Sequence, residues 1–190
     1  MADVAQNSQY VVAQLRRWLE AAVIGLDLCP FASGPWQAGR VRIEVSWAKT
    51  FEHGVRDVME QVVSLTATSP EQLSSTLVVF PDLWQDFDGF LDAIEAAEHL
   101  LISSGADEVV QLAHFHPRYV FESAEEGAYA NYSNRSPYPI FHLLRVDEVW
   151  RALESFGDGL TIAEANIRKL EAMQEGVVAL WASFMPERER

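Results

Sequence analysis

The chain has 190 residues and a formal net charge of −14, from 28 acidic and 14 basic side chains, and 49% of its residues are apolar. This balance is that of a globular protein, and it excludes the disordered, collagen-like and low-complexity classes. The single cysteine, Cys29, excludes an intrachain disulfide framework and a metal site built from cysteines alone.

Helical and extended patterns alternate along the first 115 residues. Apolar side chains recur every three or four residues in three segments, which predicts helices at 11–26, 51–65 and 87–104. Asp86 suits the N-cap of the third helix, and Gly105 its C-terminal end. Other segments predict a loop at 30–39 and strands at 40–47, 76–80 and 108–115. The strand at 76–80 has no polar alternation, so we expect both of its faces to be covered.

Residues 117–139 show neither periodicity. They hold three of the eight prolines and four of the five tyrosines. A loop of this length inside a globular protein is either functional or disordered, and its aromatic content argues against disorder. We therefore expect an ordered, functional loop.

The remaining residues predict a strand at 140–144, a short helix at 147–155 and a long amphipathic helix at 161–184. No linker or repeat divides the chain. The alternation of helices and strands predicts a single α/β domain over residues 1–190, with a layered, at least partly parallel sheet of about four strands and helices packed on it.

Three histidines are the first candidates for chemistry. His114 and His116 share one face at the carboxyl end of the strand at 108–115, the edge at which open α/β sheets bind ligands. If the strand at 140–144 returns antiparallel beside it, His142 lies almost opposite the pair. The three imidazoles would then hold a divalent metal such as zinc. The alternatives are metal-free acid–base or binding work, and a purely structural pair that hydrogen-bonds the loop covering it.

The loop supplies candidate substrate-binding residues. Arg135 offers a planar fork of donors for a carboxylate or phosphate. Asn131 and Asn134 add neutral donors, and Tyr138 belongs to the tyrosine-rich segment that would close over a substrate.

Two further arginines, Arg118 and Arg145, are close to Arg135 in sequence and would complete a positive island. The alternative is that the loop's Asn, Ser and Pro residues form turns and that Arg135 pairs with Glu122, Glu125 or Glu126.

Cys29 is a candidate nucleophile, since a neighbouring base or cation activates a thiol. However, the predicted packing puts it near the start of the strand at 40–47, at the edge opposite His114 and His116, and unpaired cysteines are usually buried. Asp82 follows the strand at 76–80 and would either orient an imidazole or cap a turn.

Three motifs together carry a resemblance to a known family. They are Leu-Cys-Pro-Phe-Ala at 28–32, His-Phe-His-Pro at 114–117 and Asn-Arg-Ser-Pro-Tyr-Pro at 134–139. The chain resembles the uncharacterised bacterial family DUF1415 over nearly its whole length. The resemblance implies a stand-alone bacterial cytoplasmic protein of this size, with no activity, substrate or cofactor to carry over.

These observations lead to two functional hypotheses. The first is an enzyme that acts on a small polar or anionic metabolite at the His-x-His pair, with or without a metal: a metal favours hydrolysis or hydration, and its absence favours proton transfer. The second is a non-catalytic ligand-binding or assembly protein, a homodimer formed through Met173, Trp181 and Phe184 of the helix at 162–185.

Composition also restricts the partners. A net charge of −14 argues against nucleic acid, because phosphate contacts need a cationic surface. The longest apolar stretch is far shorter than the ~20 residues of a membrane span, and residues 1–10 do not resemble a secretory signal. We expect a cytoplasmic protein with a small-molecule ligand.

Overall fold

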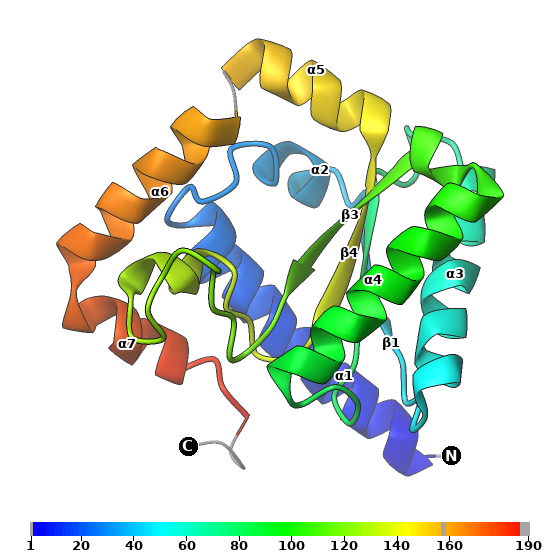
Figure 1. Cartoon of the computed structure of the whole chain (residues 1–190), viewed down its shortest axis with the longest axis horizontal. Coiled ribbons are helices and arrows are strands. Elements are labelled where there is room, and N and C mark those ends of the chain that lie inside the picture. The colour runs from blue at the N-terminus through cyan, green and yellow to red at the C-terminus, as the bar shows by residue number, and fades with distance from the viewer. Residues whose placement is uncertain (1, 157–158, 187–190) are drawn as a thin grey trace.

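Four strands form one mixed sheet in the computed structural model, which describes residues 2–156 and 159–186 (Figure 1). They are β1 (Val41–Val45), β2 (Ser75–Val79), β3 (Val110–Phe115) and β4 (Ile140–Arg145). Their order across the sheet is β1-β2-β4-β3. β1 and β2 are parallel, and β4 is antiparallel to both β2 and β3. The predicted α/β fold with a partly parallel sheet of four strands is confirmed.

Helices α3 (Phe51–Ala67) and α4 (Phe87–Ser104) cover one face of the sheet and lie together on the right of Figure 1. The α4 boundaries are as predicted: Asp86 accepts a hydrogen bond from the Gly89 amide, and Gly105 follows the helix at a φ of 70°. The core of this face includes Val58, Val62, Leu65, Val78, Phe80, Phe90, Phe141 and Leu143.

The other face is covered by α1 (Ala2–Trp18) and its π-helical continuation, Leu19–Ile24. The helix predicted at 11–26 thus begins earlier and changes geometry at Leu19. Helices α6 (Gly159–Met173) and α7 (Glu175–Ala182) add to the same core. That core includes Val11, Leu15, Trp18, Ala22, Leu77, Val79, Ile140, Leu170, Val177, Trp181 and Phe184.

Four shorter elements complete the described residues. The predicted loop at 30–39 contains helix α2 (Ser33–Gln37), and α5 (Val146–Phe156) follows β4 directly. Short 3-10 helices occupy Ala106–Glu108 and Tyr129–Ser133. None of the helices in residues 2–156 and 159–186 has the length and apolar character needed to cross a bilayer.

The predicted C-terminal helix is interrupted. Gln174 adopts a φ of 46° and separates α6 from α7. Residues 157–158, which join α5 to α6, lie outside the described residues. The side chains of Trp181 and Phe184 are only 2% and 3% exposed. They pack into the core of their own chain, so the apolar surface that the sequence offered for a dimer is used internally.

The carboxyl ends of β1, β2 and β3 meet the start of β4 at one edge of the sheet. Loop 117–139 connects β3 to β4 at this edge and is described in full, as predicted for an ordered loop. Arg145 ends β4 at the opposite edge. It therefore takes no part in a positive island with the loop arginines.

Arg145 instead ties β4 to the end of α3. Its side chain is 5% exposed and donates hydrogen bonds to the carbonyl oxygens of Leu65 (2.7 Å), Thr68 (2.5 Å) and Leu73 (3.0 Å). The last carbonyls of a helix lack intrahelical partners and carry partial negative charge. A buried guanidinium at this position both satisfies and neutralises them.

Replacing Arg145 with alanine should lower the free energy of unfolding by about 3 kcal/mol, because several buried carbonyls lose their donor at once. Urea unfolding measures the change. Arg151→Ala is the matched control, since that arginine is exposed on α5 and pairs only with Asp147, and it should change stability by less than about 0.5 kcal/mol. Equal effects of the two substitutions would contradict the capping role of Arg145.

Candidate functional site

His114 and His116 lie on the α4 face at the carboxyl end of β3, as predicted. The His116 ring packs against Phe87 and Phe90, with ring centroids 5.2 and 5.1 Å apart. The His114 ring meets the edge of Phe90 at 6.0 Å and stacks on Tyr119 at 5.5 Å. Both imidazoles therefore sit among aromatic rings, but their polar surroundings differ.

Both ring nitrogens of His116 are engaged. Its side chain is fully buried, Nε2 donates to the carbonyl oxygen of Trp84 (3.0 Å), and Nδ1 accepts from the amide of Arg118 (3.0 Å). Burial lowers the pKa of His116 to about 4, so the ring is neutral at pH 7. This is the structural role that the sequence left open: His116 joins the loop after β2 to the loop after β3.

The segment that His116 holds packs closely on α3. Trp84 adopts a φ of 56°, in the left-handed region. A Cβ atom at Gly54 would lie 2.4 Å from Cη2 of Trp84, so only glycine at this position of α3 lets the indole approach. Trp84 also packs on Phe80 and Phe141 at 4.6 and 5.2 Å. This side of the edge is a fixed wall.

His114, in contrast, has no hydrogen-bond partner among the described residues. Its Nδ1 is buried and unpaired, and no protein group bonds Nε2. The side chain as a whole is half-buried. Burial lowers the pKa of His114 below its ordinary value. The ring is therefore neutral at pH 7, with both nitrogens uncommitted.

Tyr119 and Asn134 complete the surroundings of His114. Tyr119 is 8% exposed, and burial raises the pKa of its hydroxyl, while a hydrogen bond from the Asn134 side chain opposes that shift. Asn134 also donates through Nδ2 to the His114 carbonyl oxygen (3.3 Å). Its backbone carbonyl accepts from the His116 amide (3.1 Å). Asn134 thus holds the loop against the outer edge of β3, beside the free imidazole.

The third predicted imidazole lies elsewhere. β3 and β4 pair antiparallel, as the sequence argument assumed, but the register places His142 opposite Ala113 and Phe141 opposite His114. Paired residues share a face, so His142 points to the α1 side and His114 to the α4 side. The predicted convergence of His114, His116 and His142 is wrong. Residues 2–156 and 159–186 contain no group of three or more His, Cys, Asp or Glu placed to hold a metal ion.

Arg135 is bound within its own loop. Nε donates to the carbonyl oxygen of Tyr119 (3.2 Å) and Nη2 to that of Glu126 (2.7 Å). The guanidinium also lies 4.6 Å above the ring of Tyr132. Of the two alternatives from the sequence, the bland one is closer, although Arg135 contacts the Glu126 carbonyl rather than a carboxylate.

Asn131 and Tyr138 are also engaged. Asn131 is fully buried, accepts from the Phe121 amide (3.1 Å) and donates to the carbonyls of Glu125 and Glu126 at 2.8 and 3.2 Å. Tyr138 is 3% exposed and donates its hydroxyl proton to Gln14 of α1. A ligand would have to displace these bonds, so the substrate-binding role of these residues stays a prediction.

Cys29 and Asp82 have neighbours of other kinds. Burial raises the pKa of the Cys29 thiol, and Asp27 adds to that rise, while the amides of Phe31 and Ala32 oppose it. No base or cation among these groups activates the thiol. Asp82 pairs with Lys49 at 2.5 Å. Its predicted partnership with an imidazole stays a prediction.

Sequence reasoning missed the residues that surround the histidines. Phe87 and Phe90 read only as the apolar face of a helix, and nothing in the local pattern links them to β3. Tyr119 was within reach, because it lies in the tyrosine-rich loop and three residues after His116. Trp84 could not be found, since its backbone carbonyl makes the contact.

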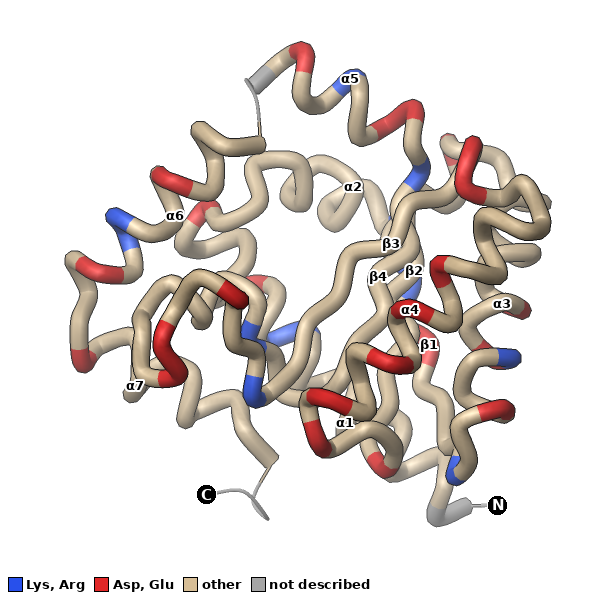
Figure 2. The backbone as a smooth tube through the Cα atoms, viewed as in Figure 1, with Lys and Arg blue, Asp and Glu red and all other residues tan. Residues whose placement is uncertain are grey.

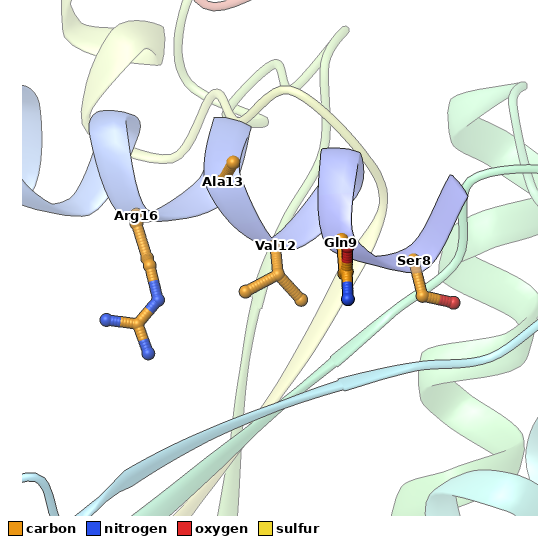
Figure 3. A pocket seen from close by; sticks show the side chains of 5 residues that line it. All are labelled: Ser8, Gln9, Val12, Ala13 and Arg16. Atoms are coloured by element: carbon orange, nitrogen blue, oxygen red, sulfur yellow. The ribbon is translucent and has the colours of Figure 1, made fainter. Parts of the chain in front are cut away.

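The surface hollows lie away from these residues. Figure 3 shows one of about 350 Å³ beside α1, lined by Ser8, Gln9, Val12, Ala13 and Arg16. Another, of about 490 Å³, lies where α1 and the π-helix meet α7. Neither contains a predicted site residue. Figure 2 shows the loop after β3 carrying two basic positions among acidic ones, and these are Arg118 and Arg135.

The buried histidines should make stability depend on pH. The folded pKa of His116 and of His142 is about 4, below the ordinary value of 6.5, so the unfolded chain takes up these protons at higher pH. Stability is full above pH 6.5 and falls as the pH falls toward 4. Between pH 7 and 5, each histidine should account for a loss of about 2 kcal/mol.

Urea unfolding of the wild type and of His116→Gln at both pH values measures this loss. The variant should lose about half of the pH dependence. NMR titration of the wild-type imidazoles gives a second reading if the variant does not fold. A His116 ring that protonates near pH 6.5 would contradict the burial argument.

The bonds of Arg135 also yield an expectation. Arg135→Ala should lower the free energy of unfolding by about 1–2 kcal/mol, because two loop carbonyls lose a charged donor. Thermal unfolding monitored by circular dichroism tests it. Arg168→Ala, an exposed arginine on α6 that pairs with Glu164, is the control and should leave stability nearly unchanged. Unchanged stability in Arg135→Ala would favour the ligand-binding role instead.

Comparison with known proteins identifies a family. A family model described as a protein of unknown function, DUF1415, matches residues 10–179. No curated protein and no solved structure matches the chain significantly. The matched range contains the segments at 28–32, 114–117 and 134–139 and all four strands of the sheet. The chain belongs to the DUF1415 family.

Proposed function

We propose that this protein is an enzyme that acts on a small polar or anionic metabolite by acid–base chemistry, with His114 as the proton-transfer group. One observation carries the proposal: of the two imidazoles in the His-x-His pair, His116 is hydrogen-bonded through both nitrogens, and His114 through neither. A neutral, uncommitted imidazole at the carboxyl edge of a sheet suits a general base.

The neighbours of His114 suit such a role. The hydroxyl of Tyr119 and the amide of Asn134 lie beside the imidazole and can orient a polar substrate. Tyr119 also stands between two cations, because Arg118 precedes it and Arg135 bonds its carbonyl oxygen. In a chain of net charge −14, these guanidiniums are the local attraction for a substrate anion.

A metal-assisted form of the reaction places stricter demands on the site. The ring nitrogens of His116 are both bonded, and His142 faces the other side of the sheet. His114 would therefore be the one imidazole of the three able to reach a metal on this face, and the remaining ligands would come from the substrate or from rearranged loop residues. We propose the metal-free form as the leading one. We place the activity in the bacterial cytoplasm, in keeping with the free thiol of Cys29.

Binding of a small anion should raise the pKa of His114, because a nearby negative charge favours the imidazolium. NMR titration of the imidazole signals, with phosphate, acetate or malate added in turn, should show a rise of about 0.5–1 unit for His114 with at least one of them. His99 on α4 is exposed and serves as the internal control. Its pKa should not follow the concentration of the anion.

The substitution His114→Gln should keep the fold and abolish the thermal stabilisation that the same anion gives to the wild type. His99→Gln should retain it. Elemental analysis of the untagged wild-type protein tests the metal form in parallel. If none of the three anions shifts the His114 titration or the melting temperature, an anionic substrate at this position is ruled out.

A further inference from the structure

The α1 face of the sheet carries a second group of uncommitted polar atoms. Nε1 of Trp18 and Nε2 of His142 are both buried, and neither has a hydrogen-bond partner. The two rings flank Phe115: the Trp18 and Phe115 centroids are 5.3 Å apart, and those of Phe115 and His142 are 6.1 Å apart. An indole donor and an imidazole nitrogen thus lie on either side of one phenyl ring.

Such atoms are rare in protein interiors. More than nine in ten buried polar groups find a partner, because an unpaired one loses its hydration without compensation. The Trp18 side chain is 1% exposed and belongs to the main core of this face. Two unpaired atoms around one ring, from different elements, are best explained by a ligand group that bonds them.

The sheet is open to solvent beside them. β4 is an interior strand, and its other face is closed by Phe141 and Leu143, which are fully buried. On the α1 side, however, His142 and Leu144 are only half-buried, as is Ala113 of β3, and Gln111 is exposed. A ligand can therefore reach His142 from this part of the sheet without crossing the core.

The backbone changes geometry at the same place. α1 passes into the π-helix Leu19–Ile24 directly after Trp18. Short π-helical segments are rare and occur frequently at functional sites. The widened turn follows the residue whose indole N–H is unpaired.

The surroundings also define the charge of the ligand. Burial alone lowers the pKa of His142, to about 4, and no charged group contributes to the shift. The walls are rings: an indole, a phenyl and a neutral imidazole. A charged molecule would lose its hydration in this place without gaining a counter-charge.

We infer that the α1 face binds an uncharged aromatic or heteroaromatic molecule through one polar group, which accepts a hydrogen bond from Nε1 of Trp18 and donates one to Nε2 of His142. The ring of the ligand would pack on Phe115. This inference does not rest on the function proposed for His114, which faces the other side of the sheet.

Phenol is the probe, since its hydroxyl both accepts and donates, and toluene is its apolar match. With ¹⁵N-labelled tryptophan, the indole signal of Trp18 is assigned from the spectrum of Trp18→Phe. Phenol should shift this signal saturably, and toluene should bind about tenfold more weakly. Trp18→Phe and His142→Leu should each weaken phenol binding by about tenfold, as read from the intrinsic fluorescence of the remaining tryptophans or from ligand-detected NMR.

The control is Trp150→Phe, which alters an indole on α5 that is exposed and should leave phenol binding unchanged. Stability gives a separate reading. Trp18→Phe and His142→Leu should unfold at equal or higher urea concentration than the wild type, because each removes an unpaired buried polar atom.

Two results would overturn the inference. One is that phenol and toluene bind equally, or that neither shifts the Trp18 signal. The other is that the Trp18 indole proton exchanges magnetisation with a long-lived bound water that phenol does not displace, because the atoms would then be satisfied by water alone. Loss of anion binding at His114 would affect neither reading.

Discussion

The antiparallel pairing of β3 with β4 determines where every histidine of the sheet points. The register sets Ala113 against His142 and His114 against Phe141, so one imidazole faces α4 and the other faces α1. A shift of one residue would bring the two imidazoles to one face, but it would also turn Phe141 and Leu143, both fully buried, out of the core beneath α3 and α4. The hydrophobic pattern of β4 therefore separates the histidines.

The same edge of the sheet combines satisfied and unsatisfied polar groups. His116, Asn131 and Arg135 each bond backbone groups of the loops, and Trp181 of α7 donates to the Arg135 carbonyl (2.9 Å). These bonds order a loop that has little regular structure. Against that rigid frame, the free nitrogens of His114 are a departure from local consistency, and such departures concentrate at functional sites.

Several features of this fold could be predicted because they follow from local periodicity. The strand at 76–80 lacks polar residues on either face and is indeed the buried β2, and Asp86 and Gly105 bound α4 as their side chains require. The parity of His142 could not be predicted, since it depends on a pairing register that no single strand encodes. The role of His116 depends on the backbone carbonyl of Trp84, which a sequence does not display. The same holds for Arg135, whose partners are carbonyls rather than the carboxylates nearby in sequence.

The electrostatics of the two faces differ as much as their polar atoms. On the α4 side, Arg118 and Arg135 stand near Tyr119 in a chain of net charge −14, so an anion approaches through a field that is favourable only locally. Attraction of this kind is screened by salt within about 8–10 Å at ordinary ionic strength. On the α1 side, no charge acts on His142, and burial of apolar surface would dominate binding, which salt does not weaken. Occupancy of the two faces should therefore respond to ionic strength in opposite ways, and a single ligand that bridges both is excluded by the sheet between them.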